Sequence, residues 1–235
     1  MAMPDWPKRG AWPLMAVLGL IAVLTWAAPG AWAKPLRLVA LGDSLVQGFG
    51  LPPEDGFVPQ LERWLRRSGL DVEVVNAGVS GDTTRGGRSR IGWAMNGRPD
   101  ALIVALGGND ALRGIDPGEV RGNLEAILSV ATENGPEVLL VGIAAPGNFG
   151  PQYAREFNAI YPELAEKYDV ALHENFLAAL ANLPDRAETL ETFFQADALH
   201  PNKRGVAKIV EDIGPQVKQL LERAERKRAE DDGGG

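Results

Sequence analysis

The chain has 235 residues, of which 45% are hydrophobic and 23% are charged, and it contains no cysteine. Its formal net charge of −7 disfavours nucleic acid or an anionic membrane as the main partner. The lack of cysteine excludes disulfide bonds, a thiolate nucleophile and a cysteine-ligated metal. This composition is typical of one ordinary globular domain.

The N-terminus has the pattern of a secretory signal. Lys8 and Arg9 precede an apolar stretch over residues 11–28, and Ala31-Trp32-Ala33 follows it. A basic segment, an apolar segment and an A-x-A site together are typical of a cleaved signal peptide. We therefore expect residues 1–33 to be removed and the protein to be periplasmic or secreted, without stable membrane insertion. An uncleaved anchor is the alternative, because the apolar stretch is close to the lower limit for spanning a bilayer.

Five apolar runs alternate with amphipathic segments along the rest of the chain. The predicted strands are residues 37–41, 72–76, 101–105, 137–143 and 170–172. The predicted helices are residues 58–68, 83–96, 117–134, 153–168, 174–181 and 203–223. Continuous apolar strands between helices predict a parallel sheet covered on both faces. We expect a flavodoxin-like, three-layer α/β/α fold with a five-stranded parallel sheet of order 2-1-3-4-5.

The chain shows no internal repeat and no interdomain linker. We therefore assign residues 34–222 to one domain. The tail, residues 223–235, is charged and then all glycine. We expect it to be disordered, since such a composition buries little apolar surface.

Small and polar residues follow the first three predicted strands. These groups are Gly42-Asp43-Ser44-Leu45, Ser80-Gly81-Asp82-Thr83 and Gly107-Gly108-Asn109-Asp110. The carboxyl ends of parallel strands share one edge of a sheet, which is where open α/β sheets bind ligands. Glycines there allow main-chain N–H groups to approach a ligand closely. The three groups therefore predict a binding site at that edge.

A further polar block, Asp197-Ala198-Leu199-His200-Pro201-Asn202, lies near the C-terminus. With Ser44, it contains the hydroxyl, imidazole and carboxylate of a nucleophilic hydrolase. The spacing of three residues allows one turn to present both Asp197 and His200. Each residue also has a structural alternative: Ser44 as a helix N-cap, Asp197 as a turn acid and His200 as a residue at a helix start. Ser80 is the rival serine, and His173, the other histidine, is expected to be structural or at the surface.

In this order and spacing, the four blocks resemble those of the SGNH, or GDSL, hydrolase family. The resemblance covers about Leu36 to Leu221 and is greatest to the branch of periplasmic thioesterases, lysophospholipases and arylesterases. It implies a serine esterase acting on carboxylic esters or thioesters, with Ser44 as nucleophile, His200 as base and Asp197 orienting His200. It also implies an oxyanion hole formed by the Ser44 main-chain N–H, Gly81 and Asn109. No cofactor and no metal are implied.

The expected substrates are small aryl esters, short or medium acyl esters, acyl thioesters or lysophospholipids. Leu112, Ile115 and Phe149 follow the third and fourth strands and are candidates for an acyl pocket. We expect a monomer. There are two alternatives. One is a carbohydrate deacetylase, for which Trp93 is an aromatic residue without an assigned place that could stack on a sugar. The other is a non-catalytic ligand-binding module on the same fold.

Two groups of charged residues have uncertain roles in the sequence. Asp43, Asp82 and Asp110 suggest either a cation site or carboxylates that hold loops through main-chain N–H groups, and we favour the second. The segment over residues 85–90 contains three arginines and two glycines and departs from the thioesterase group. Together with Arg113, it indicates either a preference for anionic substrates or ordinary solvated helix faces.

Overall fold

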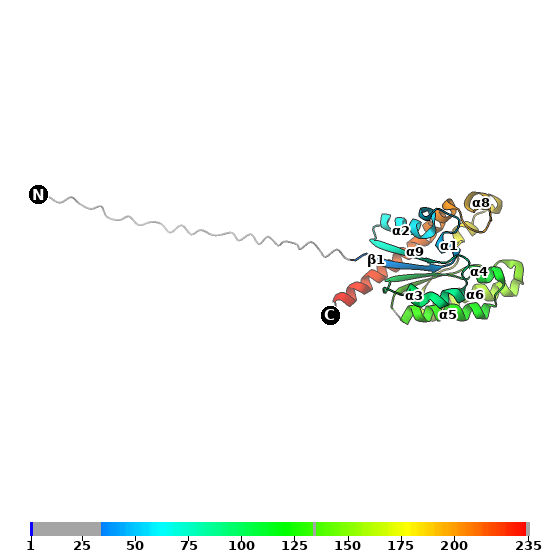
Figure 1. Ribbon diagram of the computed structural model, residues 1–235, viewed down its shortest axis with the longest axis horizontal. Helices are drawn as coiled ribbons and strands as arrows, with labels where there is room; N and C mark the ends of the chain where they lie inside the picture. Colours follow the sequence, from blue (N-terminus) through cyan, green and yellow to red (C-terminus); the bar gives the residue numbers. More distant parts are fainter. Residues whose placement is uncertain (2–33, 134, 234–235) are drawn as a thin grey trace. The chain divides into compact units, whose positions relative to one another are not determined.

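The described part of the chain comprises Met1, residues 34–133 and residues 135–233 of a computed structural model. All of the expected signal peptide except Met1 therefore lies outside the described residues, as does Asn134. Pro35–Gly235 form one compact unit, shown in Figure 1. Its strands are β1 (Leu36–Gly42), β2 (Val72–Gly78), β3 (Ala101–Ala105), β4 (Glu137–Val141) and β5 (Ala171–His173). All neighbouring strands are parallel, and their order β2-β1-β3-β4-β5 confirms the sequence-based prediction.

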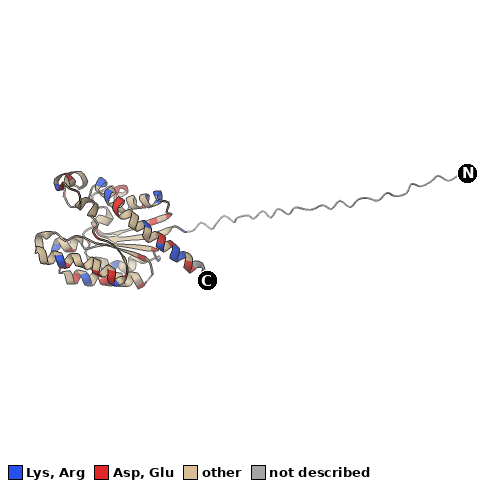
Figure 2. Cartoon of the chain, turned by 180° about the vertical axis from the view of Figure 1, so that it is seen from behind, with Lys and Arg blue, Asp and Glu red and all other residues tan. Residues whose placement is uncertain are grey.

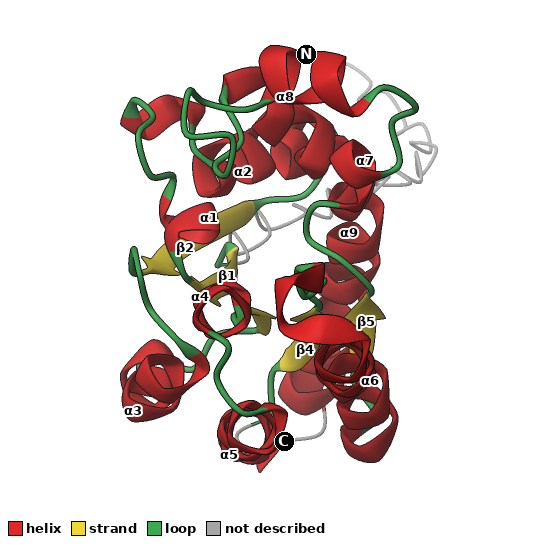
Figure 3. Ribbon diagram, turned by 90° about the vertical axis from the view of Figure 1, so that its right-hand side faces the viewer, coloured by secondary structure: helices red, strands yellow, loops and turns green. Residues whose placement is uncertain are grey.

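Helices cover both faces of the sheet, as Figure 3 shows. One face carries α2 (Phe57–Arg67) and α9 (Lys203–Gly233), and the other carries α3 (Thr84–Ala94), α5 (Pro117–Glu133) and α6 (Gly150–Tyr168). The shorter elements are α1 (Ser44–Gln47), α4 (Gly108–Arg113), α7 (Ala178–Ala181), α8 (Arg186–Phe193) and the 3-10 turns η1 (Pro53–Asp55) and η2 (Gly147–Phe149). The fold is therefore the expected three-layer α/β/α sandwich.

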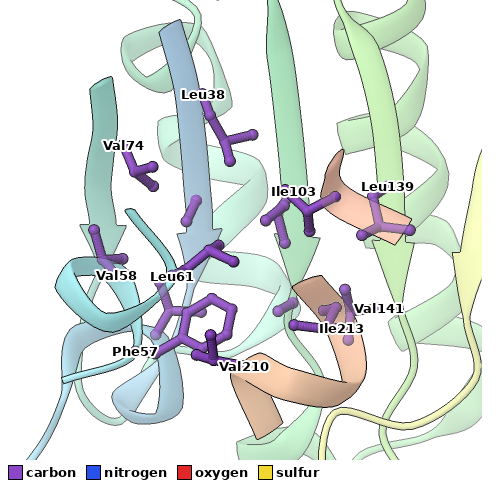
Figure 4. Packing of buried hydrophobic residues seen from close by; sticks show 14 of the residues in the cluster. Leu38, Phe57, Val58, Leu61, Val74, Ile103, Leu139, Val141, Val210 and Ile213 are labelled. Atoms are coloured by element: carbon purple, nitrogen blue, oxygen red, sulfur yellow. The ribbon is translucent and has the colours of Figure 1, made fainter. Parts of the chain in front are cut away.

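The core is divided by the sheet into two apolar clusters. Along β1, Leu38 and Ala40 face α2 and α9, whereas Val39 and Leu41 face α3, α5 and α6. This alternation follows from the two-residue period of a strand, and both faces are apolar because helices cover both. Figure 4 shows the first cluster, in which Phe57 and Ile213 pack against the sheet. A rigid sheet buried on both sides holds the strand ends in fixed positions.

Several boundaries differ from the sequence-based prediction. Strand β4 ends at Val141 rather than at residue 143, and the helix expected over residues 174–181 is limited to α7, residues 178–181. The helices α1, α4 and α8 were not expected. Their ends depend on capping side chains and on glycines in left-handed conformations, such as Gly48 (φ 87°) and Gly114 (φ 63°), which hydrophobic periodicity does not reveal.

The prediction of a disordered tail is wrong for the described residues, because α9 continues to Gly233. Arg223 binds Glu137, with Nε 2.9 Å from Oε2, and Lys227 donates to the carbonyl of Gly135 at 2.6 Å. Ala224 is only 3% exposed. The tail contains Ala, Glu, Lys and Arg, which are strong helix formers, and charges of both signs along it are visible in Figure 2. A charged composition therefore did not indicate disorder here.

Candidate active site

Ser44 is placed by a sharp transition from β1 to α1. Asp43 caps the helix, with its Oδ1 accepting the main-chain N–H of Leu45 at 3.0 Å. A side chain at Gly42 would clash with Val46, since an added Cβ would lie 2.2 Å from Val46 Cγ2. Because Asp43 is the cap, the alternative in which Ser44 is only an N-cap is wrong. Ser44 is the first residue of the helix and lines the cavity above the sheet.

Three predicted residues meet in a continuous chain of hydrogen bonds. Ser44 Oγ lies 2.9 Å from His200 Nε2, although the residues are 156 positions apart in sequence. His200 Nδ1 lies 2.7 Å from Asp197 Oδ2. With the proton on Nδ1 shared with the carboxylate, Nε2 is free to accept the hydroxyl proton of Ser44. This is the geometry of a serine nucleophile beside its base.

The loop around Asp197 and His200 folds into one tight turn. Asp197 Oδ1 accepts the main-chain N–H groups of Leu199 and His200, each at 3.0 Å. Ala198, which directly follows Asp197, has a positive φ of 54°, a conformation that is uncommon for any residue other than glycine. Hydrogen bonds from the main chain and side chain of His200 and from Leu199 lower the pKa of Asp197 from 3.8 to about 2. Asp197 therefore stays ionised at neutral pH.

Two residues that the sequence did not single out hold this turn against the rest of the site. The ring of Phe49 packs on the His200 imidazole, with centroids 4.6 Å apart. The amide of Gln195 donates to the carbonyl of Phe49 at 2.8 Å and to that of Pro201 at 3.1 Å. Gln195 thus ties the loop after α1 to the turn that carries His200. An aromatic residue five positions after Ser44 is a weak signal, since nothing in sequence indicates which distant residue it meets.

The predicted oxyanion residues come from the loops after β2 and β3. Gly81 has a φ of 78°, which explains the need for glycine there. Asn109 Nδ2 donates to the carbonyl of Asp82 at 2.9 Å and lies 3.3 Å from Asp43 Oδ2. Ser44, Gly81 and Asn109 all line the same cavity, together with His200. The structure therefore brings the predicted catalytic and oxyanion residues into one site.

Asp43 is a buried carboxyl group that lines the cavity of the site. It is 2% exposed, and burial raises its pKa from 3.8 to about 6. The Leu45 N–H, the charge of His200 and the Asn109 amide oppose this shift, and burial outweighs them. A carboxyl group that titrates near pH 6 thus lies beside the proposed oxyanion amide.

The aspartates of the first three blocks bind separate partners, as the loop-holding interpretation predicts. Asp82 binds Arg90, with Oδ2 2.7 Å from Nε, and Asp110 accepts from the main chain and hydroxyl of Thr84 at 2.9 and 2.7 Å. Within the described residues, no group of three or more His, Asp or Glu side chains is arranged to hold a metal ion. Each carboxylate instead holds a loop at the carboxyl edge of the sheet.

A cavity of about 500 Å³ opens beside Ser44. Most of its lining is apolar, and the segment over α7 and α8 contributes Leu177, Leu180, Ala181, Leu183 and Leu190 to it. Leu112 lines it as predicted. Within the described part of the chain, Ile115 and Phe149 are not among its lining residues. Phe149 instead packs on Tyr153, with ring centroids 5.3 Å apart.

The rival serine and the second histidine have other partners. The Ser80 hydroxyl lines the cavity but donates to Gln47 Oε1 at 2.9 Å. His173 is buried at the end of β5, where its Nδ1 lies 2.8 Å from Gln216 Oε1. Of the two settings expected for His173, structural or surface, the structure shows the buried one.

One protein family and several known proteins are similar to this chain. Residues 40–208 match the GDSL-like Lipase/Acylhydrolase family. Esterase TesA of Pseudomonas aeruginosa is 35% identical over 185 residues, which cover 78% of this chain and 89% of the relative. Thioesterase 1/protease 1/lysophospholipase L1 of Escherichia coli K12 is 33% identical over 186 residues, covering 78% and 84%. A crystal structure of TesA superposes with a TM-score of 0.71 at 34% identity, over 78% of this chain and 99% of that one.

Proposed function

The chain belongs to the GDSL-like lipase/acylhydrolase family and is a serine esterase, and we propose that it acts through an acyl-enzyme on Ser44. The observation that carries this proposal is the hydrogen-bonded chain from Ser44 through His200 to Asp197. A serine hydroxyl is a weak nucleophile until a neighbouring base takes its proton. Here that base and the carboxylate that orients it are both within hydrogen-bonding distance.

The reaction proceeds in two halves. Ser44 Oγ forms a bond to the carbonyl carbon while His200 Nε2 takes the hydroxyl proton, and Asp197 stabilises the resulting imidazolium. The tetrahedral intermediate then breaks its C–O or C–S bond to the leaving group, which receives that proton. A water molecule repeats the sequence on the acyl-enzyme, which releases the acid and restores Ser44.

Negative charge develops on the former carbonyl oxygen, and three donors are proposed to bind it. These are the main-chain N–H groups of Ser44 and Gly81 and the side-chain amide of Asn109. Of the two contacts that the Asn109 amide makes, the one to Asp43 at 3.3 Å is the longer. We propose that the oxyanion replaces this contact, while the bond to Asp82 keeps the amide in place.

The apolar cavity indicates an acyl group with an aliphatic chain as the part of the substrate bound on the α7–α8 side. Its volume lies within the range typical of small-molecule pockets, about 300–1,000 Å³, and its leucine-rich wall favours hydrocarbon over a sugar. Trp93, the aromatic residue considered for a deacetylase, is 61% exposed on α3 and is not one of the residues lining the cavity. Short or medium acyl esters, thioesters and lysophospholipids all fit this description.

Export to the periplasm or the medium, with cleavage after Ala33, remains our proposal for the location of the enzyme. Strand β1 begins at Leu36, so removal of residues 1–33 would leave every described strand and helix intact. Among the described residues, no helix is long and apolar enough to cross a bilayer. We further propose that the mature enzyme is a monomer. Mass spectrometry of the exported protein should find Lys34 as its first residue.

A fluorophosphonate probe tests the nucleophile. Ser44→Ala should abolish labelling, and Ser80→Ala, which removes a hydroxyl from the same cavity, should keep it. Labelling that survives Ser44→Ala would refute the acyl-enzyme proposal.

A series of p-nitrophenyl esters of increasing chain length tests the pocket. Ala181→Trp should shift the preferred acyl chain to shorter lengths by filling the cavity. Ala187→Trp, on the exposed surface of α8 and outside the lining, is the matched control. Equal chain-length profiles for both variants would place the acyl group elsewhere.

A further inference from the structure

Arg90 on α3 makes three hydrogen bonds, to the carboxyl ends of β1 and β2 and to the loop that follows β2. Its Nη2 donates to the carbonyl of Gly42 at 2.7 Å, its Nη1 to that of Ala77 at 2.6 Å and its Nε to Asp82 Oδ2 at 2.7 Å. The side chain is 18% exposed, and that of Asp82 is 13% exposed. Arg90 is therefore not part of a solvated helix face, which is one of the two interpretations of the basic segment over residues 85–90.

Each acceptor lies next to part of the site. Gly42 is the last residue of β1 and directly precedes Asp43 and Ser44. Ala77 lies near the end of β2 and pairs with Leu41. Asp82 follows Gly81, and its carbonyl accepts the Asn109 amide. One guanidinium thus contacts the ends of β1 and β2 and the loop after β2 directly, and it reaches α4, which follows β3, through Asp82.

We propose that Arg90 is a positioning residue of the oxyanion hole, which fixes the distances among the donors of Ser44, Gly81 and Asn109. The inference rests on the proposed function, because those donors belong to it. Oxyanion donors act at about 2.7–3.1 Å from the developing charge. These three come from separate segments, α1, the loop after β2 and α4, so their spacing depends on contacts between those segments.

The local sequence is adapted to this arrangement. Asp82 lies so close to Gly86 that an added Cβ would be 1.6 Å from Asp82 Oδ1, and only glycine fits there. The planar fork of arginine has donors that point to several acceptors at once, whereas lysine carries its charge at one point. Arg90 and Gly86 together account for two unexplained features of the segment over residues 85–90.

Two variants test the role, measured on p-nitrophenyl butyrate beside thermal melts. Arg90→Lys should lower kcat by about 10²-fold, since misplacing catalytic groups by about 1 Å has effects of that size. KM should change by less than about threefold, because the ground-state carbonyl depends little on oxyanion donors. Asp82→Asn is nearly isosteric but has one acceptor oxygen for the two donors that Asp82 binds, Arg90 Nε and the Thr83 N–H, and it should lower kcat in the same manner by a smaller factor.

A double-mutant cycle separates positioning from general stabilisation. In Arg90→Lys combined with Asn109→Ala, the loss in kcat should be clearly smaller than the product of the two single losses, since both act on one set of donors. Arg85→Ala, which removes an exposed positive charge from the same helix, should keep wild-type kcat.

The outcomes separate this inference from the proposed function. Near-normal kcat in Arg90→Lys or in a folded Asp82→Asn would overturn the positioning role while leaving the esterase intact. The positioning role would also be overturned if the losses in kcat of Arg90→Lys and Asn109→Ala simply multiplied in the double mutant. The same holds if the loss in kcat of each variant only followed its unfolded fraction. If the natural enzyme neither hydrolyses the ester nor labels at Ser44, both the proposed function and the positioning role fall.

Discussion

The acid–base half of the site and the oxyanion half are held together in different ways. His200 and Asp197 meet within one turn of four residues, through contacts three residues apart. The oxyanion half depends on contacts across the fold, such as Asn109 to Asp43, 66 residues apart, and Arg90 to Gly42, 48 residues apart. The first half is encoded by a short motif. The second forms only when the segments that follow β1, β2 and β3 are correctly placed relative to one another.

The two halves also contain aspartates with opposite electrostatics. Asp197 has a side chain 39% exposed, and hydrogen bonds lower its pKa to about 2. Asp43 is 2% exposed, and burial raises its pKa to about 6. One carboxylate is kept charged so that it can support an imidazolium, while the other titrates close to neutral pH. The same residue type therefore has different roles because its surroundings differ.

Asp197→Asn should break the acid–base half and have the largest effect. The amide favours the wrong tautomer of His200, and such a change lowers kcat by about 10⁴-fold in a serine protease triad. Steady-state kinetics at pH 7 checks this. Asp212→Asn is a matched control, because Asp212 is 40% exposed and lies 3.5 Å from the other histidine, His173. A similar loss in both variants would indicate a general effect of removing charge.

Asn109→Ala should break the oxyanion half with a smaller effect. Removing one donor lowers kcat by about 10²–10³-fold and should barely change KM, because the amide acts mainly in the transition state. Asn109→Asp should be at least as harmful, since a carboxylate repels the developing charge. A near-normal kcat in Asn109→Ala, or a loss that follows unfolding in a thermal melt, would make Asn109 a turn residue only.

The same contrast explains how much the sequence predicted. The five strands and their order could be predicted because continuous apolar runs alternate with helical segments. Ser44, Asp197 and His200 could be proposed as site residues because short motifs carry them. Their neighbours Phe49 and Gln195 could not, since their roles arise from contacts between loops that are distant in sequence.

The leucines that line the cavity and the contacts of Arg90 could not be predicted from the sequence either. Leu180 and Leu183 look like any core leucines in the sequence, and only the fold places them beside a cavity. Arg90 looks like a surface arginine on a helix, and only the fold shows its three acceptors. Ile115 and Phe149 are predicted as candidates because they follow the third and fourth strands, but neither residue lines the cavity.

Asp43→Asn sharpens the comparison at the smallest expected scale, through the pH dependence of stability. Asparagine can accept the Leu45 N–H as aspartate does, so the cap is kept. The folded-state pKa of Asp43, about 6, lies above its ordinary value of 3.8. Between these values the folded state retains a proton that the unfolded chain has lost. The contribution of protonated Asp43 to the free energy of unfolding is therefore fully present below about pH 4. It is lost as the pH rises through about 6.

The natural protein should accordingly lose free energy of unfolding relative to Asp43→Asn between pH 4 and pH 7.5. Two pH units at about 1.4 kcal/mol each limit this loss to about 3 kcal/mol. Urea unfolding of both proteins at several pH values measures it. Asp71→Asn removes an exposed carboxylate and should change no such slope. Parallel curves for Asp43→Asn and the natural protein would mean that Asp43 ionises without cost in the fold. Burial would then not raise the pKa of Asp43, and the electrostatic contrast between Asp43 and Asp197 would not hold.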